Sequence, residues 1–214
     1  MSLKYQLYSF RDAQVIFEHD PAYLGLWEDI TEVIESITDQ DLIRKYEELG
    51  RQGKKSLSEP INQLIDERLV ERGWNRQSPI FNDSRYQSEK GTKWTLDFSK
   101  DLIAVEVAFN HGGNTAWNLM KPVLSSQLNH VRKAIQTNAG VVITATNDLR
   151  IKGNFDNAVG TYEKFKDYLL PFYNIINVPL MIIGLEGPES FHIEPRTSTM
   201  PPRIVLNKGA QSKL

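Results

Sequence analysis

The stretch WTLDFSKDLIAVEVAFNH, residues 94–111, decides the fold because it has the pattern of a β-hairpin. We expect a short strand over residues 94–98, a turn at 99–100 and a second strand over 102–109. The second strand is rich in β-branched residues, which favour extended backbone. The rest of the chain is interpreted as support for this hairpin.

The second strand carries an acidic residue where apolar packing would not place one. Successive side chains of a strand point to opposite faces. One face is apolar, with Ile103, Val105, Val107 and Phe109. The opposite face holds Ala104, Glu106, Ala108 and Asn110. Asp97, near the end of the first strand, can approach Glu106 across the turn.

Two carboxylates held close together repel each other unless a proton or a cation lies between them. A hard divalent cation with oxygen ligands would remove that conflict, and the carbonyl of Val107 could add a ligand. A metal-activated water beside a phosphate would then hydrolyse a phosphodiester. The alternative is structural: Asp97 caps a turn, and Glu106 pairs with a neighbouring Lys or Arg.

Composition describes an ordinary globular chain. It has 214 residues, 40% of them hydrophobic and 24% charged, with a formal charge of -2. Cysteine is absent, which excludes disulfides, thiolate catalysis and zinc–thiolate sites. We find no apolar window long enough to cross a bilayer and no signal-peptide pattern, so we expect no membrane partner and a cytoplasmic location. We predict one domain over residues 1–195 and a tail, 196–214, that is mobile or ordered by a partner.

Helical and strand patterns alternate along the chain. Apolar periodicity predicts helices over 24–37, 58–73, 115–137 and 161–173, the third containing Pro122, which could bend it. Residues 140–145 and 178–185 have the pattern of buried strands. Residues 5–17 fit a strand, or a strand and a short helix. This order predicts an α/β fold with a mixed central sheet flanked by helices.

Several stretches together resemble a known family. Asp97, eight intervening residues and Glu106-Val107, in this order of elements, resemble the BglII/BstYI group of type II restriction endonucleases, which have the PD-(D/E)xK fold. Three more stretches are similar: Leu26-Trp-Glu-Asp-Ile30, Glu59-Pro-Ile-Asn-Gln through Gly73-Trp74, and Val178-Pro-Leu-Met-Ile-Ile-Gly-Leu185. The resemblance extends to about residue 187.

The resemblance implies a homodimeric, magnesium-dependent enzyme that cuts both strands of a short, GATC-containing palindrome in double-stranded DNA and leaves 5′ overhangs. Two-fold symmetry in the protein would match that of the site. A cognate DNA methyltransferase is expected in the same system, although not in complex. Asp97 and Glu106 fall on the family's metal-binding carboxylates.

One position departs from the family pattern. Ala108 stands where the family has glutamine and the wider fold usually lysine, and a methyl group can neither orient a water nor help to bind a metal. Asn110 is the nearest replacement on the same face, and His111 could act as a general base. Both residues also fall where the family reads bases, which is the role we favour. Lys100 could contact a phosphate or be solvated.

Two polar loops are further candidates for contact with DNA. Amides and carboxylates can read base edges, and the resemblance assigns base contacts to the loop that contains Asn154, Asp156 and Asn157. This loop could equally be polar surface and nothing more. Residues 50–55 form a basic, glycine-containing loop that is either solvated or close to a phosphate backbone.

Three functions remain open from the sequence. The first is the endonuclease just described. The second is a catalytically weak or silent DNA-binding relative that lost turnover with the change at Ala108. The third is a different metal-dependent nuclease on the same fold, acting in repair or on RNA. Discrete fragments, retarded but uncut DNA, and smeared degradation, respectively, would distinguish them.

Overall fold

The computed structural model describes residues 1–50, 55–87, 93–127, 130–198 and 200–207. Within these ranges a six-stranded sheet has the order β1-β6-β5-β4-β3-β2. Its strands are β1 (Tyr5–Phe10), β2 (Asn75–Pro79), β3 (Thr95–Lys100), β4 (Ile103–Val107), β5 (Ala139–Ala145) and β6 (Leu180–Leu185). The neighbouring strands β4, β5 and β6 are parallel, and the other pairs are antiparallel. The predicted mixed sheet is confirmed.

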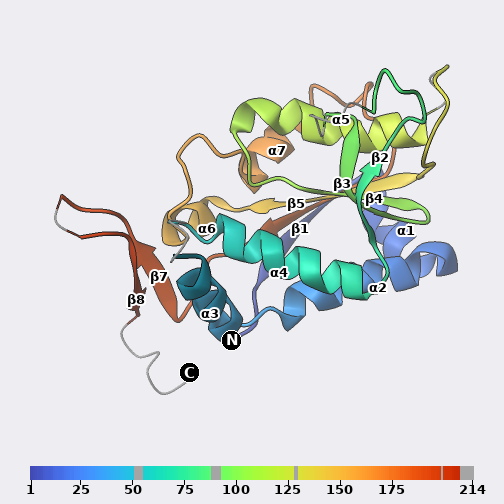
Figure 1. Ribbon diagram of the computed structural model, residues 1–214. Coiled ribbons are helices and arrows are strands. Elements are labelled where there is room, and N and C mark those ends of the chain that lie inside the picture. The colour runs from blue at the N-terminus through green and yellow to red at the C-terminus, as the bar shows by residue number, and fades with distance from the viewer. Residues whose placement is uncertain (51–54, 88–92, 128–129, 199, 208–214) are drawn as a thin grey trace.

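Helices cover both faces of this sheet (Figure 1). One face is covered by α1 (Ala13–His19), α2 (Pro21–Ser36) and α4 (Ser58–Glu71), with α3 (Asp39–Gly50) packed beside α4. The other face is covered by α5 (Thr115–Ser126) and α7 (Tyr162–Leu169). The short helix α6 (Asn147–Lys152) follows β5. The three-layer α/β architecture predicted from the alternating patterns is therefore confirmed.

The central strands are buried on both faces. Every residue of β5 and of β6 is buried, which explains why both strands have continuous apolar sequences rather than alternating ones. Val141 and Ile143 pack into the core under α2 and α4, whereas Val142 packs into the core under α5 and α7. Each such side chain stabilises the fold by about 1.5–3 kcal/mol relative to an exposed one.

Helix α5 lies unusually close to the sheet at one point. A Cβ atom added to Gly140 of β5 would lie 2.5 Å from Cβ of Pro122, so only glycine fits at this crossing. Pro122 lies inside α5, where it lacks a backbone donor, and packs its ring on β5 instead. This contact fixes the side chains of α5 above β4 and β5.

Helix α5 is shorter than its apolar pattern predicted. It ends at Ser126 rather than at residue 137, and its C-terminal carbonyl groups find other partners. The Gln136 side chain donates to the Ser126 carbonyl at 2.5 Å, and the hydroxyls of Ser125 and Thr137 form a hydrogen bond of 2.6 Å. The apolar residues beyond the helix, Val131 and Ile135, pack into a separate cluster beside β2 and β3.

Two other details differ from the sequence prediction, and a third agrees with one of its alternatives. The hairpin turns at 101–102 rather than at 99–100, with Asp101 at a positive φ of 45°. The edge strand β2 lies in a stretch for which no strand was predicted. Residues 5–17 form a strand followed by a helix, one of the two arrangements expected.

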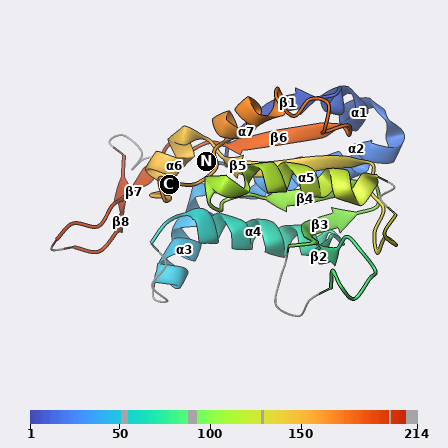
Figure 2. The same cartoon turned by 90° about the horizontal axis from the view of Figure 1, so that it is seen from above.

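A small hairpin projects beyond the sheet, and both views show it (Figures 1 and 2). It consists of β7 (Phe191–Glu194) and β8 (Arg203–Leu206). The expected division at residue 195 falls within it and stays a prediction, while residues 208–214 lie outside the described ranges. Among the described residues, no helix combines the length and apolar character needed to span a bilayer.

Candidate active site

The two candidate carboxylates come from neighbouring antiparallel strands, Asp97 from β3 and Glu106 from β4. The carboxylate of Asp97 accepts a hydrogen bond from the backbone N–H of Val107 at 2.9 Å. The backbone N–H of Asp97 makes a longer contact, 3.4 Å, with Oε1 of Glu106. The structure thus brings together all three residues that we expected to hold a metal ion.

Both carboxylates are difficult to ionise at this position. Glu106 is only 1% exposed, and burial together with the nearby charge of Asp97 raises its pKa to about 8. Burial also raises the pKa of Asp97, against the opposing effects of the Lys121 charge, the Val107 N–H and the Gln77 side chain. Lys121 opposes the rise at Glu106 without abolishing it, so a further cation is needed beside this pair for both groups to be charged at neutral pH.

A lysine that the sequence analysis did not select lies beside this pair. Lys121 of α5 donates from Nζ to Oε2 of Glu106 at 2.6 Å, and its side chain is 8% exposed. The sequence analysis gave such a pairing of Glu106 with a Lys or Arg as the structural alternative to metal binding. The only signal in the sequence was a lysine within a mostly apolar helix, between Met120 and Pro122.

A cleft of about 540 Å³ opens beside Asp97 and Val107. Its opposite wall is α4, which contributes Glu59, Asn62, Gln63, Asp66 and Glu67. A second hollow of about 220 Å³ shares Glu59, Asn62 and Val107 with this cleft and reaches Asn110. The two hollows connect Asp97 with the end of β4, whereas the buried Glu106 lines neither of them.

The sequence analysis missed this helical wall. Positions 59, 62, 63 and 66 have the i, i+3, i+4, i+7 spacing of one helix face, and they are all polar. Such a stripe is the usual solvent face of an amphipathic helix. Nothing in the stripe itself indicates that it faces a cleft, because that depends on how α4 lies beside β3.

The donor set suits a hard divalent cation. Asp97 and Glu106 offer carboxylate oxygens, and no cluster of three or more His, Cys, Asp or Glu side chains capable of holding a metal occurs in the described ranges. Mg²⁺ commonly takes only one or two carboxylates and completes its shell with water and substrate phosphates. Two converging carboxylates beside an open cleft fit that requirement.

Ala108 is 1% exposed and belongs to the apolar cluster under α5 and α7. Its methyl group offers no polar atom to the site. Asn110, the nearest replacement considered, accepts a hydrogen bond from Asn118 of α5 at 3.2 Å and lies at the far end of the second hollow. Neither Ala108 nor Asn110 places a cation beside the carboxylates, whereas Lys121 does.

The segment after β4, which contains Asn110 and His111, lies beside the loop that contains Asn154, Asp156 and Asn157. The N–H of Gly112 donates to the Ala158 carbonyl at 2.6 Å, and the N–H of Gly160 donates to the Asn110 carbonyl at 3.2 Å. Among the selected residues, Asn110, His111, Asp156 and Asn157 are exposed. The neighbouring loops thus present four of the five selected polar side chains on one surface.

Local contacts occupy some of these side chains. His111 Nδ1 accepts from the Gly113 N–H at 3.0 Å, and the Asn157 side chain accepts from Arg150 at 2.6 Å. Asn154 is only partly exposed, and its amide donates to the Lys55 carbonyl at 2.8 Å. The basic loop at 50–55 therefore reaches this region through Lys55, while residues 51–54 lie outside the described ranges.

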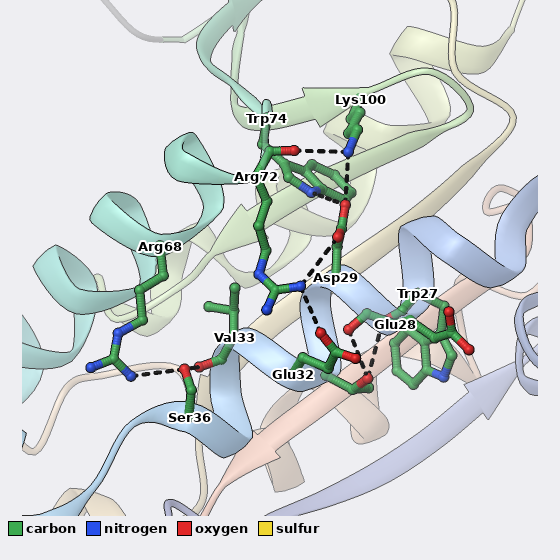
Figure 3. A network of polar contacts seen from close by, with 11 residues as sticks. Trp27, Glu28, Asp29, Glu32, Val33, Ser36, Arg68, Arg72, Trp74 and Lys100 are labelled. Carbon is green, nitrogen blue, oxygen red and sulfur yellow. Dashed lines mark hydrogen bonds and ion pairs between the residues drawn. The ribbon is translucent and has the colours of Figure 1, made fainter.

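Lys100 has a structural role rather than a phosphate contact (Figure 3). Its Nζ donates to Asp29 of α2 and to the carbonyl of Arg72, each at 2.8 Å. Asp29 also accepts from the Trp74 indole at 3.2 Å and from Arg72 at 3.3 Å. Burial alone would raise the pKa of Asp29, but these hydrogen bonds, led by that from Lys100, lower it below its ordinary value.

Two carboxylates on adjoining strands of a mixed sheet, one of them lining a cleft, suit metal-dependent hydrolysis of a phosphodiester. The family model for "Restriction endonuclease BglII/BglIII" matches residues 5–185, and the chain belongs to this family. It is therefore a type II restriction endonuclease, a site-specific deoxyribonuclease, and the family implies use of a divalent metal ion.

Solved structures agree with this assignment at the level of the fold. The structure of BglII complexed with a DNA 16-mer has a TM-score of 0.63 and 17% sequence identity, and the match covers 95% of this chain and 100% of that one. Free BglII has a TM-score of 0.51 and 20% identity, with 94% and 93% of the two chains covered. The comparison with curated protein sequences gave no match.

Proposed function

We propose that this endonuclease makes magnesium-dependent double-strand cuts at a short palindrome built around GATC and leaves 5′ overhangs. One observation carries the proposal: Asp97, whose backbone N–H contacts Glu106, lines a cleft that continues to Asn110. A cleavage site and a candidate base-reading residue thus lie along one path. The related BglII structure that contains DNA supports double-stranded DNA as the substrate.

In the proposed mechanism Asp97, Glu106 and the carbonyl of Val107 hold Mg²⁺. When bound, Mg²⁺ makes water a stronger nucleophile and neutralises negative charge on the phosphate. The chain's own contribution is orientation: the Val107 N–H fixes the Asp97 carboxylate, and the Lys121 ammonium fixes that of Glu106. Fixed dipoles and charges of this kind need no rearrangement during the reaction.

Recognition is assigned to Asn110, His111, Asn154, Asp156 and Asn157. An amide can bond adenine through two hydrogen bonds, and a carboxylate can accept from cytosine, so these side chains suit a mixed sequence. A homodimer places two copies of this surface on a palindrome, each copy reading one half and cutting one strand. The system would include a cognate methyltransferase that protects host DNA, and the protein would act in the cytoplasm.

A DNA-binding relative with little turnover is the second candidate. Two observations favour it: Ala108 offers no polar group, and Lys121 already pairs with Glu106 without any metal ion. Such a protein would keep the recognition surface and the dimer. It would retard DNA that contains its site without cutting it.

Incubation of the protein with a sequenced plasmid and Mg²⁺ tests the proposal. We expect discrete fragments whose mapped ends share one palindrome, with 5′ extensions. Asp97→Ala should abolish them while retaining binding to the same fragment in Ca²⁺, and sedimentation should give the mass of a dimer. Uncut but specifically retarded DNA with the unmodified protein would replace the first candidate by the second.

A further inference from the structure

The buried pair formed by Lys121 and Glu106 is not explained by stability alone. Its two side chains are 8% and 1% exposed. Taking both charges out of water costs several kcal/mol per ion, and well-packed apolar residues in their place are often neutral or stabilising. A charged lysine on the buried face of α5 therefore calls for a role beyond packing.

We propose that Lys121 is a positioning residue that holds the Glu106 carboxylate in its metal-binding orientation, a task that the methyl group of Ala108 cannot perform. The inference rests on the proposed function, because it takes Glu106 to be a metal ligand. Lys121 is assigned no contact with the phosphate or the attacking water. It acts through Glu106.

The two oxygens of Glu106 have different partners. Oε2 accepts from Lys121 on the α5 side, and Oε1 points toward the backbone of Asp97. Lys121 thus holds one oxygen of the carboxylate, while the other lies 3.4 Å from the backbone N of Asp97. A metal ligand held by another group in this way binds its ion about 10–100-fold better than one left free to rotate.

Helix α5 can do this because it is itself held in place. Pro122, the neighbour of Lys121, packs on Gly140 of β5, and Asn118, one turn earlier, donates to Asn110. These contacts fix the helix above β4 and set the direction from which the ammonium approaches Glu106. The lysine therefore comes from a rigid element, as precise positioning requires.

A simple neutralising role gives the opposite expectation for metal affinity. If Lys121 only balanced the charge of Glu106, removing it would leave two carboxylates without a competing cation, and a divalent ion would bind more tightly. If Lys121 positions Glu106, its removal frees the carboxylate and weakens binding. The sign of the change separates the two roles.

The test measures Mn²⁺ binding without DNA, by electron paramagnetic resonance, in the full chain. We expect Lys121→Met to weaken Mn²⁺ binding about 10–100-fold. Lys121→Arg, which keeps the charge and the donors, should recover most of the affinity. Lys166→Met is the matched control, because Lys166 lies on the same side of the sheet, with Nζ over the rings of Tyr8 and Tyr162. It should leave Mn²⁺ binding unchanged.

Cleavage kinetics give a second readout. At saturating Mg²⁺, Lys121→Met should lower kcat about 10–100-fold and leave KM for DNA nearly unchanged, because the recognition loops are untouched. Thermal melting establishes that the variant is folded. If the methionine variant unfolds, Lys121→Gln replaces it: its side chain is one bond shorter and uncharged, so it cannot form the ion pair with Glu106, and the same loss of Mn²⁺ affinity is expected.

Equal or tighter Mn²⁺ binding by folded Lys121→Met would overturn the inference, as would an equal loss in Lys166→Met. A wild-type protein that binds Mn²⁺ but cuts no DNA would refute the proposed function alone, and the binding comparison would still decide the role of Lys121. A wild-type protein that binds no Mn²⁺ would refute both.

Discussion

Asp29→Asn removes one negative charge from the network that joins α2, α4 and β3, and its effect can be worked out from the contacts in Figure 3. Asp29 accepts hydrogen bonds from Lys100, Trp74 and Arg72. Asparagine has the same shape but only one accepting oxygen. Its amide group must therefore face at least one of these donors.

The loss should be moderate because each cation keeps a second partner. Lys100 retains the Arg72 carbonyl, and Arg72 retains Glu32 at 2.7 Å. A hydrogen bond to a charged group contributes about 1.5–3 kcal/mol, and the 19% exposure of Asp29 places the net loss near the lower end, at about 2 kcal/mol. For a chain of this size, that loss lowers Tm by about 4–8 °C.

Urea and thermal unfolding at neutral pH would measure this loss. The matched control is Glu32→Gln, which alters an exposed contact of Arg72 and should cost less than about 1 kcal/mol. A Tm for Asp29→Asn within about 1 °C of the wild type, or a larger loss in Glu32→Gln, would refute the reasoning. The network would then be a set of solvated contacts without a role in joining α4 to β3.

Three further predictions follow from single contacts. Burial alone would raise the pKa of Asp41, but hydrogen bonds, led by one from an arginine, lower it as they do for Asp29. The two ionised carboxylates therefore stabilise the folded protein above the ordinary pKa of 3.8, and this stability is lost as the pH falls through their lowered pKa values. In acid titrations, the stability of Asp29→Asn should fall less steeply than that of the wild type. Gly140→Ala should cost about 1–3 kcal/mol in urea unfolding, because the new Cβ meets Pro122; unchanged stability would contradict the close crossing of α5. Asn110→Ala should lower the preference for the cognate site about tenfold or more in competition binding and leave the melting temperature nearly unchanged; equal loss on all DNA sequences would argue against base reading.

Much of the sheet could be predicted because its strands carry their pattern locally. The apolar runs at β5 and β6 and the alternation in β4 indicate strands without knowledge of their neighbours. The boundaries of α5 could not be predicted in the same way. Apolar residues continue at helical spacing after Ser126. Val131 and Ile135 nevertheless pack into a different cluster, and their spacing in the sequence does not indicate this because the buried residues of that cluster are distant in sequence.

The residues of the candidate site likewise divide into those that the local sequence indicates and those that depend on how helices pack on the sheet. Asp97 and Glu106 could be selected because a carboxylate on a small-residue strand face is anomalous in the sequence itself. Lys121 and the α4 wall could not, because each is an ordinary residue of an ordinary helix until the helix is placed against the sheet. Lys100 shows the reverse error: a lysine beside a turn was a candidate for phosphate contact, yet Asp29, far away in sequence, binds it.

The dependence on α5 has a consequence for how cleavage relates to recognition. Asn118 and Lys121 are three residues apart and therefore lie on one face of the helix, where the first contacts Asn110 and the second contacts Glu106. A helix is stiff over a single turn, so a displacement of one contact is transmitted to the other. Under the proposed function, a DNA sequence that fits the loop at Asn110 leaves Glu106 correctly held, whereas one that displaces Asn110 also disturbs the carboxylate that cleavage needs.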